Sequence, residues 1–189
     1  GPGGAPPLGS FTPEDVASLT PGALEDFRPG QIGRIPADAF QEFRPDQLGA
    51  IPPEAMKAFN NEQLGALPPT AMAGMRPEQV RQMPPDAMRG IEPAQVGAMP
   101  PNAFSGFKAA QLGAMPPRAF GALQPEQVRE IPPSAMRGME PRQLGAVPPE
   151  AMAQMSPLQI RQMPPEAMGR LEPDQVTVLR LEVFEALRP

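Results

Sequence analysis

The sequence predicts an all-α solenoid made of very short helices, each begun by a proline, with two helices in each 16-residue coil. Three observations support this fold class: a strict 16-residue period, apolar residues at fixed places in every period, and prolines at fixed places between them. Nine such units follow one another from residue 33 to residue 176 without insertion or deletion. A regular repeat is typical of stacked architectures, whereas an aperiodic chain with this much Pro and Gly is typical of disorder.

Fixed columns of the repeat predict its buried side. With each unit numbered from 1 to 16, positions 3, 8, 11 and 16 are apolar in all nine units. Position 4 is always Pro, position 5 is Pro except at Ala37, and position 13 is Pro except at Asn61 and Ala109. Each unit therefore consists of two related octads. The first reads x-x-Φ-P-P-x-Ala-Φ and the second x-x-Φ-x-Pro-x-Gln-Φ, where Φ is apolar.

Each octad predicts one short helix. Positions 7, 8 and 11 have the spacing i, i+1 and i+4, which places them on one helix face, and positions 15, 16 and the next 3 have the same spacing. Proline at position 5 or 13 suits the first residue of a helix, because the N–H that it lacks would have no partner there. The residue before a proline is disfavoured in the helical region, so the preceding helix must end.

Helices this short need neighbours, since isolated helices below about 12 residues are marginal in water. Stacked repeats share interfaces, which is how solenoids gain stability. Small residues at two positions suit a close approach of neighbouring coils. They are Gly49, Gly65, Gly97 and Gly113 at position 1, and Gly74, Gly90, Gly106 and Gly138 at position 10. Two alternatives remain open at this point: a β-solenoid with a 16-residue coil, and a polyproline II bundle.

The chain divides into three parts on this pattern. Residues 1–16 fit the repeat in their second half alone, so they are either a partial N-terminal repeat or a remnant of an artificial fusion. Residues 17–176 hold ten repeats that we expect to form one solenoid. Residues 177–189 contain no Pro until Pro189, so we expect a longer helix that begins near Pro173 and caps the stack.

Two invariant columns are the candidate functional or structural positions. The Gln column at position 15 consists of Gln47, Gln63, Gln79, Gln95, Gln111, Gln127, Gln143, Gln159 and Gln175. The Ala column at position 7 consists of Ala39, Ala55, Ala71, Ala87, Ala103, Ala119, Ala135, Ala151 and Ala167. A ladder of amides suits binding of an extended partner, but it also suits backbone groups that tight turns leave unpaired. We favour the second, structural interpretation.

The composition argues against several classes of function. The 189 residues include no His and no Cys, so we expect no enzyme, no catalytic residues and no bound cofactor. The net charge is −5 with both signs interspersed, which predicts no nucleic-acid partner, and no apolar run approaches the roughly 18 residues of a membrane span. Acidic residues at positions 6 and 14 alternate with residues such as Thr70 and Ala94, so we expect no metal site. Met shares its columns with Phe, Ile and Leu, which favours core filling over a pliable binding groove.

The octads "GAIPPEAM", "KAFNNEQL" and "RQMPPEAM" resemble a known repeat. Very large bacterial secreted and cell-surface proteins carry tandem octads of the type Ala-Ala-Leu-Thr-x-x-Gln-Ile. Here Pro replaces the usual Thr, and every second Gln is Ala. The resemblance implies a segment of a large surface or secreted protein, and it implies no catalytic residues.

These observations predict a structural role. We expect a rigid, elongated spacer or scaffold within a larger protein, because positions 6, 9, 10, 12 and 14 vary while the interior columns are fixed. The alternative is a repeat module that binds a protein or a peptide on one face. A binding face needs a contiguous stripe of similar residues, and the 16-residue period shows none.

Overall fold

The chain is a succession of short helices separated by proline-containing turns. The computed structural model describes residues 11–186, with side chains as far as Leu179. Within that range there are 21 helices and no strand, and all but three of the helices begin at a proline. The all-α solenoid of short, proline-initiated helices, two in each 16-residue unit, is therefore confirmed.

The two octads form different kinds of helix. The Gln octads form α-helices, in which Val96 N–H donates to Glu92 O at 3.1 Å. Seven of the nine Ala octads form 3₁₀ helices, in which Ala103 N–H donates to Pro100 O at 3.0 Å. This tighter winding is typical of helices of this length.

The α-helices are α1 (Pro13–Ala17), α2 (Pro21–Leu24), α3 (Pro29–Gly33), α4 (Pro45–Ala50), α5 (Asn61–Ala66), α6 (Pro77–Gln82), α7 (Pro85–Met88), α8 (Pro93–Ala98), α9 (Ala109–Ala114), α10 (Pro125–Glu130), α11 (Pro141–Ala146), α12 (Pro149–Met152), α13 (Pro157–Gln162) and α14 (Pro173–Ala186). The 3₁₀ helices are η1 (Ala37–Glu42), η2 (Pro53–Ala58), η3 (Pro69–Gly74), η4 (Pro101–Gly106), η5 (Pro117–Ala122), η6 (Pro133–Gly138) and η7 (Pro165–Arg170).

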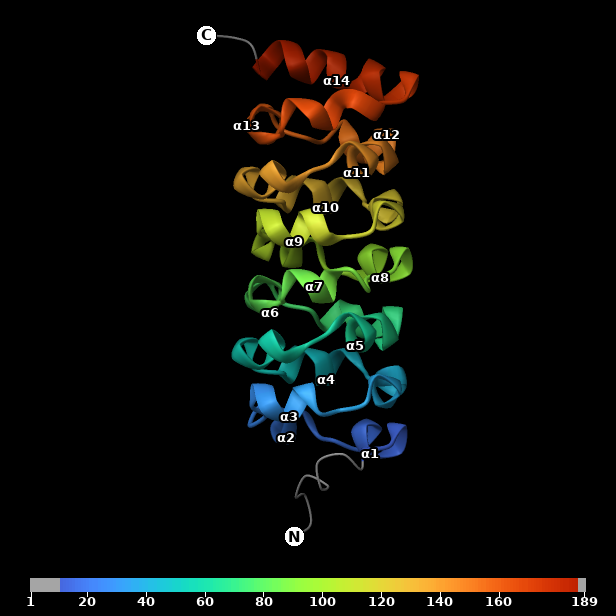
Figure 1. Ribbon diagram of the computed structural model, residues 1–189, viewed down its shortest axis with the longest axis vertical. Coiled ribbons are helices and arrows are strands. Elements are labelled where there is room, and N and C mark those ends of the chain that lie inside the picture. Colours follow the sequence, from blue (N-terminus) through green and yellow to red (C-terminus); the bar gives the residue numbers. More distant parts are fainter. Residues whose placement is uncertain (1–10, 187–189) are drawn as a thin grey trace.

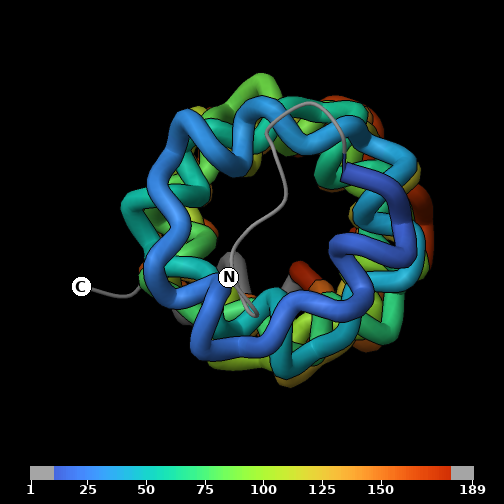
Figure 2. The backbone as a smooth tube through the Cα atoms, turned by 90° about the horizontal axis from the view of Figure 1, so that it is seen from below, coloured from blue at the N-terminus to red at the C-terminus, as the bar shows by residue number. Residues whose placement is uncertain are grey.

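The helices wind into an elongated superhelical stack. Its coils follow one another along the long axis in Figure 1, and they form a ring around that axis in Figure 2. Helix α6 packs on η2 and η4, which lie three octads before and after it in the chain, and nearly all other helix pairs have the same offset. Because three is an odd number of octads, a helix from a Gln octad packs against helices from Ala octads. The contact of α13 with the long α14 is the exception among the described helices.

One superhelical turn is longer than the 16-residue unit. Helices stack at an offset of three octads, and the side chain of Gln79 reaches carbonyls that are 28 and 31 positions earlier, so one turn takes more than three octads. The expectation that one coil equals one repeat unit was wrong, because the sequence period counts chemically equivalent helices. The coil length is set by how many helices are needed to surround a core of large side chains.

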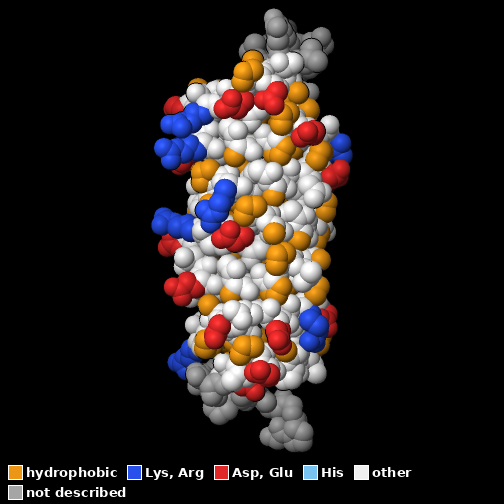
Figure 3. All heavy atoms as spheres, turned by 90° about the vertical axis from the view of Figure 1, so that its right-hand side faces the viewer, with side chains coloured by type: hydrophobic (Ala, Val, Ile, Leu, Met, Phe, Trp, Pro, Cys, Tyr) orange, Lys and Arg blue, Asp and Glu red, His pale blue; other side chains and the backbone are white. Residues whose placement is uncertain are grey.

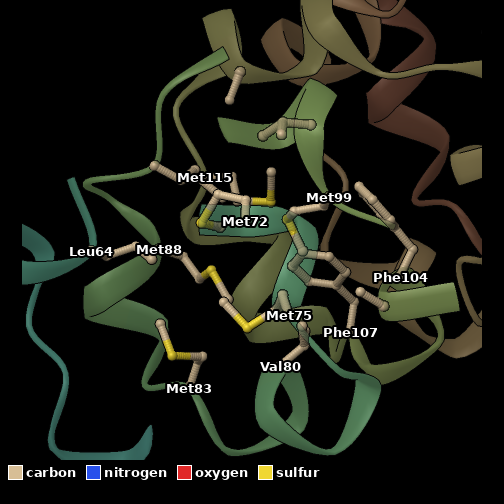
Figure 4. Close-up of a cluster of buried hydrophobic side chains, with 14 of the residues drawn as sticks. Leu64, Met72, Met75, Val80, Met83, Met88, Met99, Phe104, Phe107 and Met115 are labelled. Carbon is tan, nitrogen blue, oxygen red and sulfur yellow. The ribbon is translucent and has the colours of Figure 1, made fainter. Parts of the chain in front are cut away.

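The core fills the inside of the ring. The predicted columns at positions 3, 8, 11 and 16 are buried through most of the stack, and positions 7 and 15 are buried with them. In the middle of the stack, Met72, Met75, Met88 and Met99 pack with Phe107 between coils (Figure 4). Met therefore serves as core filling there, as its shared columns predicted.

The C-terminal end of the stack is covered by a longer helix. Helix α14 begins at Pro173, packs on α12 and α13, and lies across the end of the stack in Figure 1. It runs through residue 177 without a break, and Leu179 is buried. The capping role predicted for residues 177–189 stays a prediction, and residues 1–10 and 187–189 lie outside the described residues. No helix between residues 11 and 186 is long and apolar enough to cross a membrane.

Candidate functional site

The Gln column occupies the same place in every Gln octad, the third residue of the α-helix. All nine side chains are 0–3% exposed, and they are the only buried polar residues within the described part of the chain. A residue at position 12 stands directly before the helix that carries each Gln, and its backbone N–H precedes the first turn. Such N–H groups have no partner inside their own helix.

Gln95 shows the geometry of the column. Its Oε1 accepts the N–H of Glu92, the residue before α8, at 2.8 Å. Its Nε2 donates to Leu64 O at 2.7 Å and to Leu67 O at 2.8 Å, at the C-terminal end of α5. One side chain thus supplies an acceptor to the start of its own helix and two donors to the end of a helix in the preceding coil.

The same arrangement recurs in all nine Gln octads of the clean units. The N–H at position 12 donates to Gln Oε1 in each of them, at 2.7–3.0 Å. Gln Nε2 donates to one carbonyl at position 16 and one at position 3 of earlier units, from Val16 and Leu19 for Gln47 to Leu144 and Val147 for Gln175. No buried side-chain nitrogen or oxygen in the described residues lacks a partner.

Gln31, in the first Gln octad, differs from the later members. Its Oε1 accepts Arg28 N–H at 2.7 Å, but its Nε2 has no carbonyl partner among residues 11–186. Gln31 is half-buried, whereas Gln47 is fully buried. The hydrogen bonds from Gln Nε2 to backbone carbonyls of another coil therefore need a preceding coil.

The Ala column lies at the equivalent place in the Ala octads, the third residue of each helix. All nine alanines are 0% exposed. The residue before each of these helices is Pro at position 4, which has no N–H to donate. An acceptor such as Gln Oε1 is thus unnecessary at position 7, and a methyl group fills the space.

Position 12 adds a second link between coils in several units. Arg76 Nε donates to Gly49 O at 3.0 Å, and Arg44 Nη1 donates to Ala17 O at 2.8 Å. Gln124 Nε2 reaches Gly97 O at 3.3 Å. These side chains supplement the buried Gln at helix ends whose last carbonyls lack partners within the helix.

The Gln column makes its hydrogen bonds to the backbone. Both N–H groups of the Gln95 amide and its Oε1 are bonded to backbone groups, and the column is 0–3% exposed. Among the described residues, no three His, Cys, Asp or Glu side chains are grouped so that they could hold a metal ion. On the face in Figure 3, acidic and basic side chains are interspersed, with apolar side chains between them.

Two shallow grooves on the surface were missed by the sequence reasoning. One, of about 390 Å³, is lined by Lys57, Arg81 and Lys108 together with Pro84, Pro85 and Ala110. The other, of about 550 Å³, also includes Ala110 and continues past Arg137 to Glu166. The sequence repeat hides the group of three cations, because they occupy three different positions of the repeat. Knowing how many residues separate neighbouring coils would bring these three cations together.

The comparisons with known proteins give no relative: no family model matches the chain, and no curated protein matches it either.

Proposed function

We propose that this chain acts as a rigid, elongated spacer or scaffold within a larger protein at the cell surface or outside the cell. The observation that carries the proposal is the unbroken series of Gln side chains from Gln47 to Gln175, each of which ties one helix to the end of a helix in the preceding coil. The surface or secreted setting is supported by the octad pattern, which resembles repeats of very large bacterial proteins.

Rigidity follows from where these bonds lie. Each Gln from Gln47 to Gln175 makes at least two hydrogen bonds across the coil interface in a buried setting, and bending the stack there would leave donors and acceptors unpaired. A buried group without its partner costs about 1–3 kcal/mol. Because the same bonds recur in every coil, resistance to bending is distributed over the whole length of the stack.

A non-catalytic role is supported by the polar groups of the interior. The buried polar side chains of the described residues are nine amides, and each is occupied by backbone groups. The exposed ion pairs, such as Lys57 with Glu54 at 2.9 Å, are of the kind that contributes little to stability. The fixed interior and the variable exterior are what a spacer requires.

Small-angle X-ray scattering tests the proposal. The intact chain should give the pair-distance distribution of a rod, and a variant without residues 97–128, two complete units, should be shorter by about 10 Å, given a helix spacing of about 8–10 Å. The matched control is a variant with Glu78→Gln and Glu126→Gln, two position-14 changes outside the core that should leave the length unchanged. A compact particle, or a distribution that broadens as for a flexible chain, would refute the rigid spacer.

A further inference from the structure

Cationic side chains from three successive coils meet in one groove. Lys57 comes from η2, Arg81 from the end of α6, and Lys108 from the residue before α9, and all three line the groove of about 390 Å³. No Asp or Glu lines it among the described residues. The groove is therefore positively charged, although the chain as a whole has a net charge of −5.

Two of the three cations have no carboxylate partner. Within the described residues, neither Arg81 nor Lys108 lies within 4.0 Å of an Asp or Glu oxygen. Lys57 contacts Glu54 at 2.9 Å, but both side chains are more than half exposed. An exposed pair of this kind is weak and exchanges readily with another carboxylate.

The groove also has apolar lining. Pro84, Pro85, Ala110 and Met83, which is 2% exposed, line it together with Gln82 and Gln111. A groove that combines apolar and cationic lining suits an extended main chain whose side chains reach the charged groups. The groove has no deep, enclosed cavity of the kind that buries a compact small molecule.

We propose that this groove binds an extended acidic peptide segment of a protein partner. Because the cations come from successive coils, they are about 8–10 Å apart along the stack. A chain in the extended polyproline II conformation advances about 3.1 Å per residue with three residues per turn, so carboxylates at every third residue lie on one side and match this spacing. The inference goes beyond the spacer role and does not depend on it.

The adjoining groove limits where the acidic run can lie. Beyond Ala110, Arg137 donates to Gln162 Oε1 at 2.7 Å, and Glu140 and Glu166 line the same groove. The positive stretch therefore covers Lys57 to Lys108 and gives way to mixed charge beyond it. A partner should place its carboxylates over the first stretch and neutral or basic residues over the second.

Protein fits this groove better than nucleic acid. Single-stranded nucleic acid is bound through aromatic side chains on which the bases stack, together with a basic groove. Every Phe in the part of the chain whose side chains are described is buried, including Phe59 and Phe107, and the sequence has no Tyr or Trp. The groove thus offers charge and some apolar lining but no aromatic side chain on which a base could stack.

Fluorescence anisotropy at low salt tests the proposal with defined probes. The first probe is a labelled peptide of three three-residue repeats, each with one Glu and two residues that are Gly or Ser, so that Glu stands at every third position. The others are the same peptide with Lys in place of Glu, and an oligothymidylate of similar length. We expect saturable binding of the Glu peptide that weakens steeply as salt is added, and no binding of the Lys peptide.

Charge-reversal variants locate the binding. Arg81→Glu combined with Lys108→Glu should weaken binding of the Glu peptide at least tenfold. The matched control is Arg34→Glu combined with Arg129→Glu, which changes the net charge equally at exposed residues outside the groove and should change affinity less than twofold. Circular dichroism checks that both variants are folded. Failure of the Glu peptide to bind, an equal loss in both variants, or tighter binding of the oligothymidylate would each overturn the proposal.

Discussion

Helices α8 and η4 are adjacent in the chain and differ in how the backbone of the residue before the helix is satisfied. Before α8, the N–H of Glu92 is taken up by Gln95 Oε1 at 2.8 Å. Before η4, Pro100 has no N–H, and Ala103 stands where the Gln would be, with 0% exposure. The alternation of Gln and Ala along the chain thus follows from whether the residue before the helix carries a donor.

The two octads also differ in what they give to other coils. The amide of Gln95 reaches back to Leu64 O and Leu67 O, so the Gln octads hold the coils together by hydrogen bonds. The segments that carry the Ala column contribute close contact instead: a Cβ added to Gly90, which follows α7, would clash with Asn61 O. Helices that pack at an offset of three octads combine one octad of each kind, whereas the hydrogen bonds of Gln95 join α8 to the end of α5, which also carries a column Gln. The comparison shows a division of roles between polar linkage and close packing.

The largest expected effect comes from removing a single octad. Deletion of residues 97–104 would place Gln octads against Gln octads and bring Gln111 opposite Met72 O and Met75 O, the end of an Ala octad. Gln111 and Gln127 would each lose their position-16 and position-3 carbonyl partners, and four unpaired groups at about 1–3 kcal/mol each total about 4–12 kcal/mol. That is as large as the stability of many domains. Urea unfolding followed by circular dichroism should show loss of the single cooperative transition.

Deletion of a complete unit is the control for this comparison. Removing residues 97–112 keeps every Gln at the same offset from a position-16 carbonyl and a position-3 carbonyl, so the variant should unfold cooperatively with a midpoint near that of the intact chain. If both deletions unfold alike, the two octads are interchangeable, and the division of roles described above is incorrect.

Much of this architecture could be predicted from sequence, and the remainder depends on winding. The buried columns and the start of helices at proline follow from local rules, as Pro93 and Val96 illustrate. The acceptors of Gln95 do not, because offsets of 28 and 31 along the chain are multiples of neither 8 nor 16. Those offsets depend on how many helices close one turn. Lys57 and Arg81 occupy different positions of the 16-residue unit, so the repeat does not group them although they line one groove.

A carboxyl group in the Gln column should make stability depend on pH. In Gln95→Glu, the new carboxylate can still accept Glu92 N–H but would face Leu64 O and Leu67 O without a proton to donate. Burial and these carbonyls raise the pKa of the introduced carboxyl above its unfolded value of about 4.3. The folded state then binds more protons than the unfolded state, so stability is retained below about pH 4 and falls as pH rises, by about 1.4 kcal/mol per pH unit up to the folded pKa.

Urea unfolding of Gln95→Glu at several pH values measures this effect, with Gln31→Glu as the matched control. Gln31 accepts the same kind of bond from Arg28 N–H, but it is half-buried and faces no carbonyl among the described residues. Its variant should show a much smaller dependence on pH. A flat pH profile for Gln95→Glu would mean that the inter-coil half of the Gln interaction contributes little to stability.

The smallest expected effect tests the close-packing role of the segments that carry the Ala column. Gly90→Ala would put a methyl group against Asn61 O, a backbone atom at the start of α5, so the coils must separate locally at a cost of about 1–3 kcal/mol. Gly97→Ala is the control in α8, a helix that carries a column Gln: its nearest atom would be Ala122 O at 3.8 Å, and the loss of a helical glycine should be neutral or stabilising by up to about 1 kcal/mol. Thermal unfolding compares the two variants.

The natural sequence sharpens this last comparison. Ala122 occupies the same column as Gly90, which shows that a coil can form around a methyl group at this position. Equal stability of Gly90→Ala and Gly97→Ala would therefore mean that neighbouring coils adjust their spacing freely. A loss of stability confined to Gly90→Ala would mean that the Gln hydrogen bonds on either side fix that spacing. The hydrogen bonds of one octad would then determine how closely the other octad must pack.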